Sequence, residues 1–145
     1  MTDRSDHDSI EAAIYRDKIR EIQEVVGNYY HVKLDAIGSH SRKREIVQAR
    51  QAVQYFARKH CRTLSLAMIA RLTSNGRPFD HATVCNSIRK INSFLSLKRR
   101  DGSFVYQSFK DEFQRLESLV IISLNKTRME ASMDDFSWHI GNAYN

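Results

Sequence analysis

Residues 65–91, SLAMIARLTSNGRPFDHATVCNSIRKI, decide the fold class of this chain. Ser65 is a suitable N-cap for a short helix over Leu66–Leu72, because its hydroxyl can accept a hydrogen bond from an amide of the first turn. The run Thr73–Pro78 predicts a turn, and Asp80 can cap a second helix. Two helices joined by such a turn predict a helix-turn-helix.

The second helix of this pair has two chemically distinct faces. Its core stripe consists of four apolar residues at helical spacing: Val84, Ile88, Ile91 and Leu95. Its outward face consists mostly of short or polar residues: Ala82, Thr83, Asn86, Arg89 and Lys90. Such an outward face suits the base edges of a DNA major groove, which admits one helix. Other helical hairpins share the same division of faces, so the pattern alone indicates duplex binding without proving it.

The segments on either side of this pair predict further helices. Apolar residues at three- and four-residue spacing predict helices over 9–30, 44–60 and 105–124, and Lys33–Gly38 predicts a short helical turn. One Pro and five Gly in 145 residues also favour long helices over many short strands. We therefore expect an all-α domain of about six helices over residues 9–124. A loose acidic arm is expected over residues 1–8, and a tail that contains Trp138 over residues 125–145.

The charge is distributed unevenly along the chain. There are 23 Lys or Arg and 17 Asp or Glu, which gives a net charge of +6. Residues 36–100 contain 14 of the basic residues and only two acids, Glu45 and Asp80, for a local net charge of +12; the rest of the chain has a net charge of −6. A contiguous basic block is the expected footprint of a polyanionic ligand. A solvated charged surface is the alternative interpretation.

Composition and motifs argue against several other classes of protein. Two cysteines, Cys61 and Cys85, cannot form a disulfide framework, and no apolar run is long enough to span a bilayer. We therefore expect a cytoplasmic protein with no membrane partner. The sequence has no glycine-rich phosphate loop, no zinc motif and no catalytic pair of carboxylates. We expect no catalytic residues, no cofactor, no metal and no enzyme activity.

Several stretches resemble one known family. The run SHSRKREIVQARQ over residues 39–51 resembles the basic loop and long helix of the C-terminal, duplex-binding domain of the bacterial replication initiator DnaA. Residues 65–70 are similar to the first helix of its helix-turn-helix, and DHATV at 80–84 with IRKI at 88–91 is similar to its recognition helix. The resemblance covers roughly residues 18–122 and implies an all-α, Trp-repressor-like fold.

The resemblance also implies roles for individual residues. Arg42 matches the basic-loop arginine that enters the minor groove. The positions that match base-contacting residues are Asp80, His81 and Ala82 in the recognition helix, and Leu66 and Ala67, which match a pair that contacts thymine methyl groups. The positions that match phosphate-binding residues are Lys43, Arg44, Arg50, Gln51, Arg58, Thr83 and Lys90. These roles agree with general chemistry, because arginines bind phosphates or a narrow minor groove and an exposed helix start reads base edges.

Three departures from the family pattern limit what the resemblance implies. The family usually has Thr at the position of Ala82, so a hydroxyl contact is lost and the resemblance does not give the preferred base at that step. The turn over Ser74–Phe79 is longer than the compact turn of the family, which puts the seating of the recognition helix in question. The nucleotide-hydrolysing and helicase-loading modules of the family have no counterpart in this sequence, so we expect duplex binding but not origin opening.

We expect a sequence-specific double-stranded DNA-binding protein at the nucleoid that regulates replication initiation or transcription. Its partner would be a duplex that carries an initiator-type box or a related site. The alternative is a protein-interaction adaptor with the same fold, which would bind a protein through the acidic C-terminal third or the tail around Trp138. An RNA-binding protein or a nuclease is a third interpretation with the least support.

Overall fold

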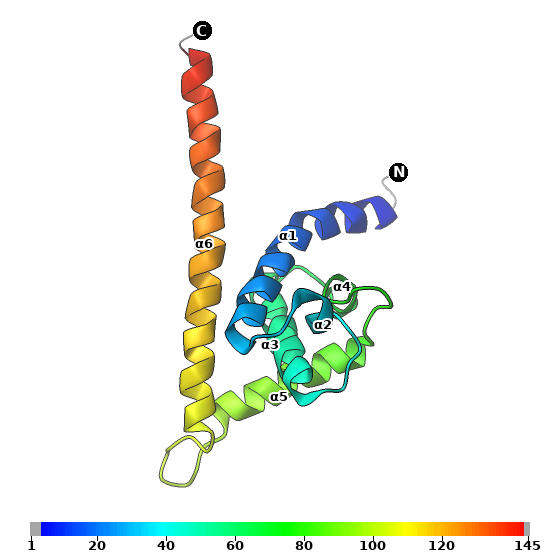
Figure 1. Ribbon diagram of the computed structural model, residues 1–145, viewed down its shortest axis with the longest axis vertical. Helices are drawn as coiled ribbons and strands as arrows, with labels where there is room; N and C mark the ends of the chain where they lie inside the picture. Colours follow the sequence, from blue (N-terminus) through cyan, green and yellow to red (C-terminus); the bar gives the residue numbers. More distant parts are fainter. Residues whose placement is uncertain (1–3, 144–145) are drawn as a thin grey trace.

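The computed structural model describes the backbone of residues 4–143 and the side chains of residue 10 and residues 12–133. Within these residues there are six helices, shown in Figure 1: α1 (Arg4–Tyr30), α2 (Leu34–Ile37), α3 (Arg44–His60), α4 (Leu66–Leu72), α5 (His81–Ser96) and α6 (Gln107–Ala143). The one β-type pairing in this part of the chain is an isolated bridge between Lys98 and Phe104, in the loop before α6. The expected all-α fold of about six helices is confirmed.

The helices at both ends are longer than the sequence predicts. α1 begins at Arg4, so residues 4–8 are helical rather than loose, and residues 1–3 lie outside the described residues. α6 continues to Ala143 instead of ending at Leu124. The expected boundaries followed the loss of apolar periodicity, but mostly polar residues without Pro can propagate a helix that packed turns have already nucleated. The side chain of Trp138 lies outside the described residues.

The core consists of two adjoining clusters that share α3. The larger cluster lies between α1, α3, α5 and α6 and includes the buried residues Ile22, Val53, Phe56, Ile91 and Phe113. The second cluster lies beside α4 and includes the buried residues Ile19, Leu64, Ile69, Phe79 and Val84. α1, α3 and α5 each contribute buried residues to both clusters, and because α3 packs against α1, α2, α4 and α5 it is the central helix on which α4 and α5 are seated.

The apolar stripes predicted from the sequence mostly face this core. In α5, Val84 and Ile91 are buried and the predicted outward residues are all exposed. In α1, however, Ile10 and Ile14 are 63% and 65% exposed. The reason is visible in Figure 1, where the N-terminal part of α1 extends away from the other helices. A regular apolar pattern therefore overestimated how far along α1 the core reaches.

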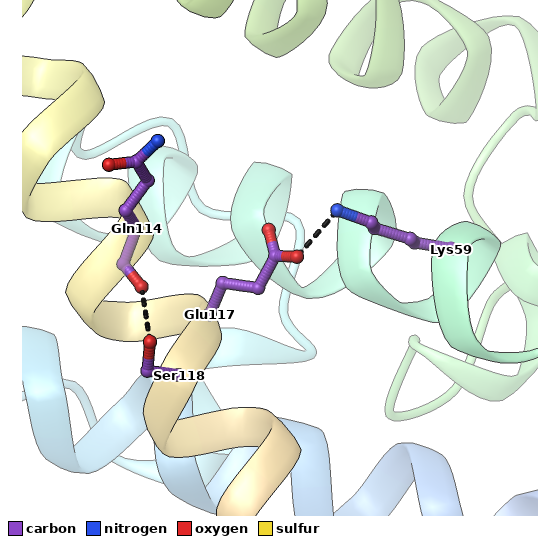
Figure 2. Close-up of polar contacts among 4 residues, drawn as sticks. All are labelled: Lys59, Gln114, Glu117 and Ser118. Atoms are coloured by element: carbon purple, nitrogen blue, oxygen red, sulfur yellow. Dashed lines mark hydrogen bonds and ion pairs between the residues drawn. The ribbon is translucent and has the colours of Figure 1, made fainter.

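Polar contacts hold the first half of α6 against the other helices. Lys59 of α3 donates a hydrogen bond to Glu117 of α6, an ion pair that Figure 2 shows. Further along α6, the hydroxyls of Ser123 and Thr127 both donate to the carboxylate of Glu21 in α1. The rest of α6 projects beyond the other helices (Figure 1). α6 has 37 residues, but no helix in the described part of the chain has an apolar stretch long enough to cross a membrane.

His60, the last residue of α3, has a half-buried imidazole. Its ring centroid lies 6.3 Å from that of Phe56, and its Nε2 atom is buried without a hydrogen-bond partner. Burial lowers the pKa of His60 below its ordinary value of 6.5; Glu117 opposes this shift, whereas Lys18 and two other nearby cations add to it. The folded chain therefore favours the neutral imidazole.

We expect His60 to make the fold less stable in mild acid. Because its pKa is lower in the folded chain, the unfolded chain takes up a proton first as the pH falls through about 6.5. The free energy of unfolding then decreases until the pH passes below the folded-state pKa. Urea denaturation at about pH 7.5 and about pH 5.5 measures this change. The His60→Gln variant should lose less stability than the wild type over this interval, and an equal loss in both proteins would contradict the assignment.

Candidate nucleic-acid interface

Side-chain caps begin both helices of the helix-turn-helix. Asp80 has an extended backbone, and its Oδ1 accepts a hydrogen bond of 3.0 Å from the amide of Ala82 in the first turn of α5. The hydroxyl of Ser65 accepts one of 3.1 Å from the amide of Met68 in α4. Each cap satisfies an amide that has no partner within its helix. Both N-caps predicted from the sequence are confirmed.

The first turn of α5 presents a short row of exposed side chains. Asp80 and His81 are 72% and 68% exposed, and Oδ1 of Asp80 lies 3.7 Å from Nδ1 of His81. Ala82 and Thr83 follow them and are also exposed. The opposite side of the helix is buried at Val84. This row combines a carboxylate acceptor, an imidazole, a methyl group and a hydroxyl, which are groups that can read base edges in a major groove.

α4 packs against α5 as the sequence predicts for a helix-turn-helix. Ile69 and Ala70 of α4 and Val84 of α5 are buried in the same apolar cluster. At the first turn of α4, Leu66 is half-buried and Ala67 is exposed. Apolar side chains are therefore available at the beginnings of both helices of the pair.

The long turn between α4 and α5 is fixed to the segment that follows α2. The backbone amide of Asn75 donates a hydrogen bond of 3.0 Å to the carbonyl of Gly38. The side-chain amide of Asn75 donates one of 2.7 Å to the carbonyl of Asp35. A Cβ atom at Gly38 would meet the Asn75 side chain at 2.3 Å, so this close approach requires glycine. The length of this turn put the seating of the second helix in question, but these hydrogen bonds anchor it.

Phe79 is where this turn meets α3 and the basic loop, which we define as residues 39–43. It is buried directly before α5 in the same cluster as Val84, the arrangement of a hydrophobic staple. The ring centroid of His40 lies 4.6 Å from that of Phe79. The guanidinium of Arg50 in α3 lies 5.1 Å from the Phe79 ring centroid, within the range of a cation–π contact.

Arg50 and His40 also fix the backbone of the basic loop. Nη1 of Arg50 donates hydrogen bonds to the carbonyls of Ser39, at 2.8 Å, and Ser41, at 3.0 Å. Nε2 of His40 lies 2.7 Å from the carbonyl oxygen of Arg77 in the long turn. Burial lowers the pKa of Arg50, but an arginine stays protonated at neutral pH. One nitrogen of a residue predicted to bind phosphate is therefore used to position the loop.

The packing of α3 on α5 gathers several of the predicted DNA-binding residues. Four of them line one cavity: Arg42, Arg44, Gln51 and Lys90. The three cationic side chains among these four are exposed, and none of the ion pairs in the described part of the chain involves them. Lys43 is exposed in the basic loop. Arg58 lies about two helical turns beyond Gln51 on α3, and its Nη1 donates a hydrogen bond of 3.0 Å to the carbonyl of Leu64.

Sequence reasoning missed three residues that build this interface: His40, Asn75 and Phe79. A signal for Phe79 was present, because an apolar residue directly before a helix N-cap commonly packs on the fourth helical residue. No local signal existed for the other two. Asn75 and His40 contact backbone carbonyls 40 and 37 residues away in the sequence, and only the folded chain brings these segments together.

The described side chains contain no cluster of three or more His, Cys, Asp or Glu that could hold a metal ion. Cys61 is buried and Cys85 is half-buried, and both are free thiols. Burial raises the pKa of the Cys61 thiol, which disfavours its reactive thiolate form.

Comparison with known proteins gives one consistent result. The family model described as the bacterial dnaA protein helix-turn-helix matches residues 19–91, half of the chain. The chromosomal replication initiator protein DnaA of Flavobacterium psychrophilum is 32% identical over 84 residues, which are 58% of this chain and 17% of that protein. The protein of the same name from Wolbachia pipientis wMel is 31% identical over 116 residues, or 80% and 21% of the two chains.

The same-named protein of Aquifex aeolicus is 38% identical over 87 residues, which are 60% of this chain and 20% of that protein. The chain thus spans about a fifth of the length of the curated relatives it matches. No solved structure matches the chain.

We expect Arg50 to hold the basic loop in place by its geometry as well as its charge. Arg50→Lys keeps the charge but cannot donate to two carbonyls from one planar group. It should lower the free energy of unfolding by about 1–3 kcal/mol and speed amide hydrogen exchange in residues 39–43. Arg58→Lys, which removes a contact outside this loop, is the matched control. Unchanged exchange in the loop of the Arg50 variant would refute this role.

Proposed function

The chain belongs to the family of the bacterial dnaA protein helix-turn-helix, and on this premise we propose that it is a sequence-selective double-stranded DNA-binding protein. In this function the first turn of α5 lies in the major groove, and the basic loop lies against the backbone and the adjacent minor groove. The observation that carries the proposal is the exposed, capped row Asp80–Thr83 on α5, the helix whose Lys90 lines one cavity together with the exposed cations Arg42 and Arg44. The protein itself performs no catalysis.

The cations and the row on α5 contribute different parts of binding. Arg42, Arg44 and Lys90 release counterions from phosphates, which supplies affinity for any duplex and makes binding sensitive to salt. The carboxylate of Asp80 can accept a hydrogen bond from a cytosine amino group, and the imidazole of His81 can donate or accept one. Ala82 offers a methyl contact where a hydroxyl would offer a hydrogen bond. The α5 row is therefore one source of sequence preference.

The junction at Phe79 supports simultaneous contact with the base edges and the backbone. Phe79 directly precedes α5, and His40 and Arg50 connect it to the basic loop. A loop held in this way loses little further conformational freedom when it meets DNA, so less binding energy is spent on ordering it. Arg42 in this loop is the residue that we assign to the minor groove.

The relatives suggest where such binding acts. They carry the name chromosomal replication initiator protein, and this chain matches about a fifth of their length. We propose that the protein occupies initiator-type boxes or related sites as a regulator of replication initiation or transcription. Leu66 and Ala67 of α4 would contact thymine methyl groups, and Lys43, Gln51, Arg58 and Thr83 would contact phosphates together with the cations already named.

One feature of α6 favours a second function, the binding of a protein partner. Five large apolar side chains between positions 119 and 133 of α6 are exposed: Leu119, Ile121, Ile122, Met129 and Met133. Exposed apolar groups gathered on one element often mark a site of protein interaction. In this function the protein is an adaptor with the same fold. Co-purification with a partner, combined with no DNA binding at low salt, would favour it over the first function.

We expect selectivity for an initiator-type box. A labelled duplex that carries the box should bind at physiological salt at least about tenfold more tightly than a scrambled duplex of the same length and composition. In vitro selection of bound duplexes, followed by sequencing, then defines the preferred site and the effect of Ala82. Equal affinity for the boxed and scrambled duplexes would show that this box is not recognised.

We also expect base reading and phosphate binding to separate in two variants. His81→Ala should weaken binding to the preferred duplex by about 1–3 kcal/mol and have little effect on a scrambled one. Lys90→Gln should lower the affinity for both duplexes by a similar factor. It should also reduce the salt dependence of binding by the amount expected for about one lost phosphate contact. Titrations of both duplexes at two salt concentrations measure these effects. A loss at His81 that is equal on the two duplexes would rule out base reading by this residue.

A further inference from the structure

The cavity lined by Arg42, Arg44 and Lys90 also has an aromatic part, which has no role in binding DNA phosphates. Its volume is about 520 Å³, and it lies between α3, α5 and the beginning of α6. Its floor is aromatic and is formed by Phe94, Tyr106, Phe109 and Phe113. Cavities of this size with an apolar lining and a few polar groups at the edge are typical of small-molecule sites in proteins.

The aromatic floor has accessible ring surface. The ring of Phe94 contacts those of Tyr106 and Phe109 edge to face, with centroids 4.7 Å and 5.4 Å apart. Phe109 and Phe113 stack at 5.3 Å. Phe113 is buried in the core, but Phe94 and Phe109 are only half-buried and Tyr106 is 41% exposed. A flat ring can therefore lie against Phe94 and Tyr106 without displacing the core.

The rim of the cavity is positively charged. Arg42, Arg44 and Lys90 are exposed, and none of them takes part in an ion pair within the described residues. Nζ of Lys90 lies 5.8 Å from the Phe94 ring centroid, which places a cation directly above the aromatic floor. Burial, with a further contribution from Glu112, raises the pKa of Tyr30 at the cavity edge to about 12, so its phenol is neutral at physiological pH.

We propose that this cavity binds a small anion that carries a flat aromatic ring, with the ring on Phe94 and Tyr106 and the anionic group at Arg44 and Lys90. The cationic rim and the aromatic floor together indicate this class of ligand. A bare phosphate would leave the aromatic floor in water, and a neutral apolar molecule would leave the cations without a counter-charge. A DNA duplex reaches the rim with its phosphates, but its bases are stacked inside the helix and bring no ring to the floor.

A ligand in this cavity competes with DNA for the same cations. Arg42, Arg44 and Lys90 line the cavity and are also assigned to the minor groove and phosphates. An occupied cavity therefore lowers the affinity for DNA. This competition rests on the proposed function, whereas the ligand site itself does not.

Binding of anilinonaphthalene sulfonate to the full chain tests the ligand class. This fluorescent probe has flat aromatic rings and one sulfonate, and its neutral counterpart, phenylnaphthylamine, lacks the anion. We expect one saturable site that binds the sulfonate several-fold more tightly than the neutral molecule, because an exposed cation contributes up to about fivefold. Equal affinity for the two probes would overturn the assignment of an anion.

Variants locate the site. Tyr106→Ala should lower the affinity for the sulfonate probe by about tenfold, because stacking on an exposed ring is lost. The same variant should bind the duplex as the wild type does. Ile122→Ser removes an exposed apolar group on α6, far from the cavity lining, and should leave probe binding unchanged. The proposal is overturned if Tyr106→Ala binds the probe like the wild type. It is also overturned if only Ile122→Ser loses the signal, because the probe would then report α6.

A competition experiment separates this proposal from that of DNA binding. An unlabelled duplex should displace the probe from the wild-type protein. A saturating concentration of the probe should lower the affinity of the protein for the duplex. If no duplex binds but the probe still depends on Tyr106 and Lys90, the proposed function fails and the ligand site stands. If the duplex binds with the probe still in place, the site and the DNA surface do not overlap, and the competition is wrong.

Discussion

The contact between Arg50 and Phe79 is the constraint on which the side of this protein that we propose binds DNA depends. One guanidinium lies on the aromatic ring that ends the long turn and donates to two carbonyls of the basic loop. Two segments without regular structure, the long turn and the basic loop, are thereby fixed to α3. Without this contact, the basic loop would lose two hydrogen bonds and its connection through Arg50 to the turn, and in the proposed function it would lose more conformational entropy on binding DNA.

The placement of charge follows from the same packing. Basic residues between positions 36 and 100 are scattered over α3, α4, α5 and the segments before, between and after them, and the seating of α5 on α3 brings Arg42, Arg44 and Lys90 to the edge of one cavity. None of these cations forms an ion pair with a described carboxylate, so they can bind an anion. The aromatic floor beneath them comes from the junction of α5 and α6. The proposed phosphate contacts and the aromatic cavity thus share one set of charges.

Much of this architecture could be predicted because its signals are local. The caps at Ser65 and Asp80, the bounds of α3 and the buried stripe of α5 follow from short-range hydrogen bonding and helical periodicity. The ends of α1 and α6 could not be predicted in the same way, because the apolar pattern reports contact with a core and not the continuity of a helix. The exposure of Ile10 and Ile14 has the same cause: the apolar pattern is present where the core is not.

The sequence by itself determined the helices, the helix-turn-helix, the family and the position of the basic block, since each depends on residues that are close together or on a motif read in order. Only the tertiary structure decided that Asn75, His40 and Phe79 join the turn to the basic loop, that Arg50 is partly used to hold that loop, and that an aromatic cavity underlies the cations. These features depend on contacts between separate segments of the chain, such as the hydrogen bonds of Asn75 and His40 to carbonyls 40 and 37 positions away, and packing on α3 brings these segments together.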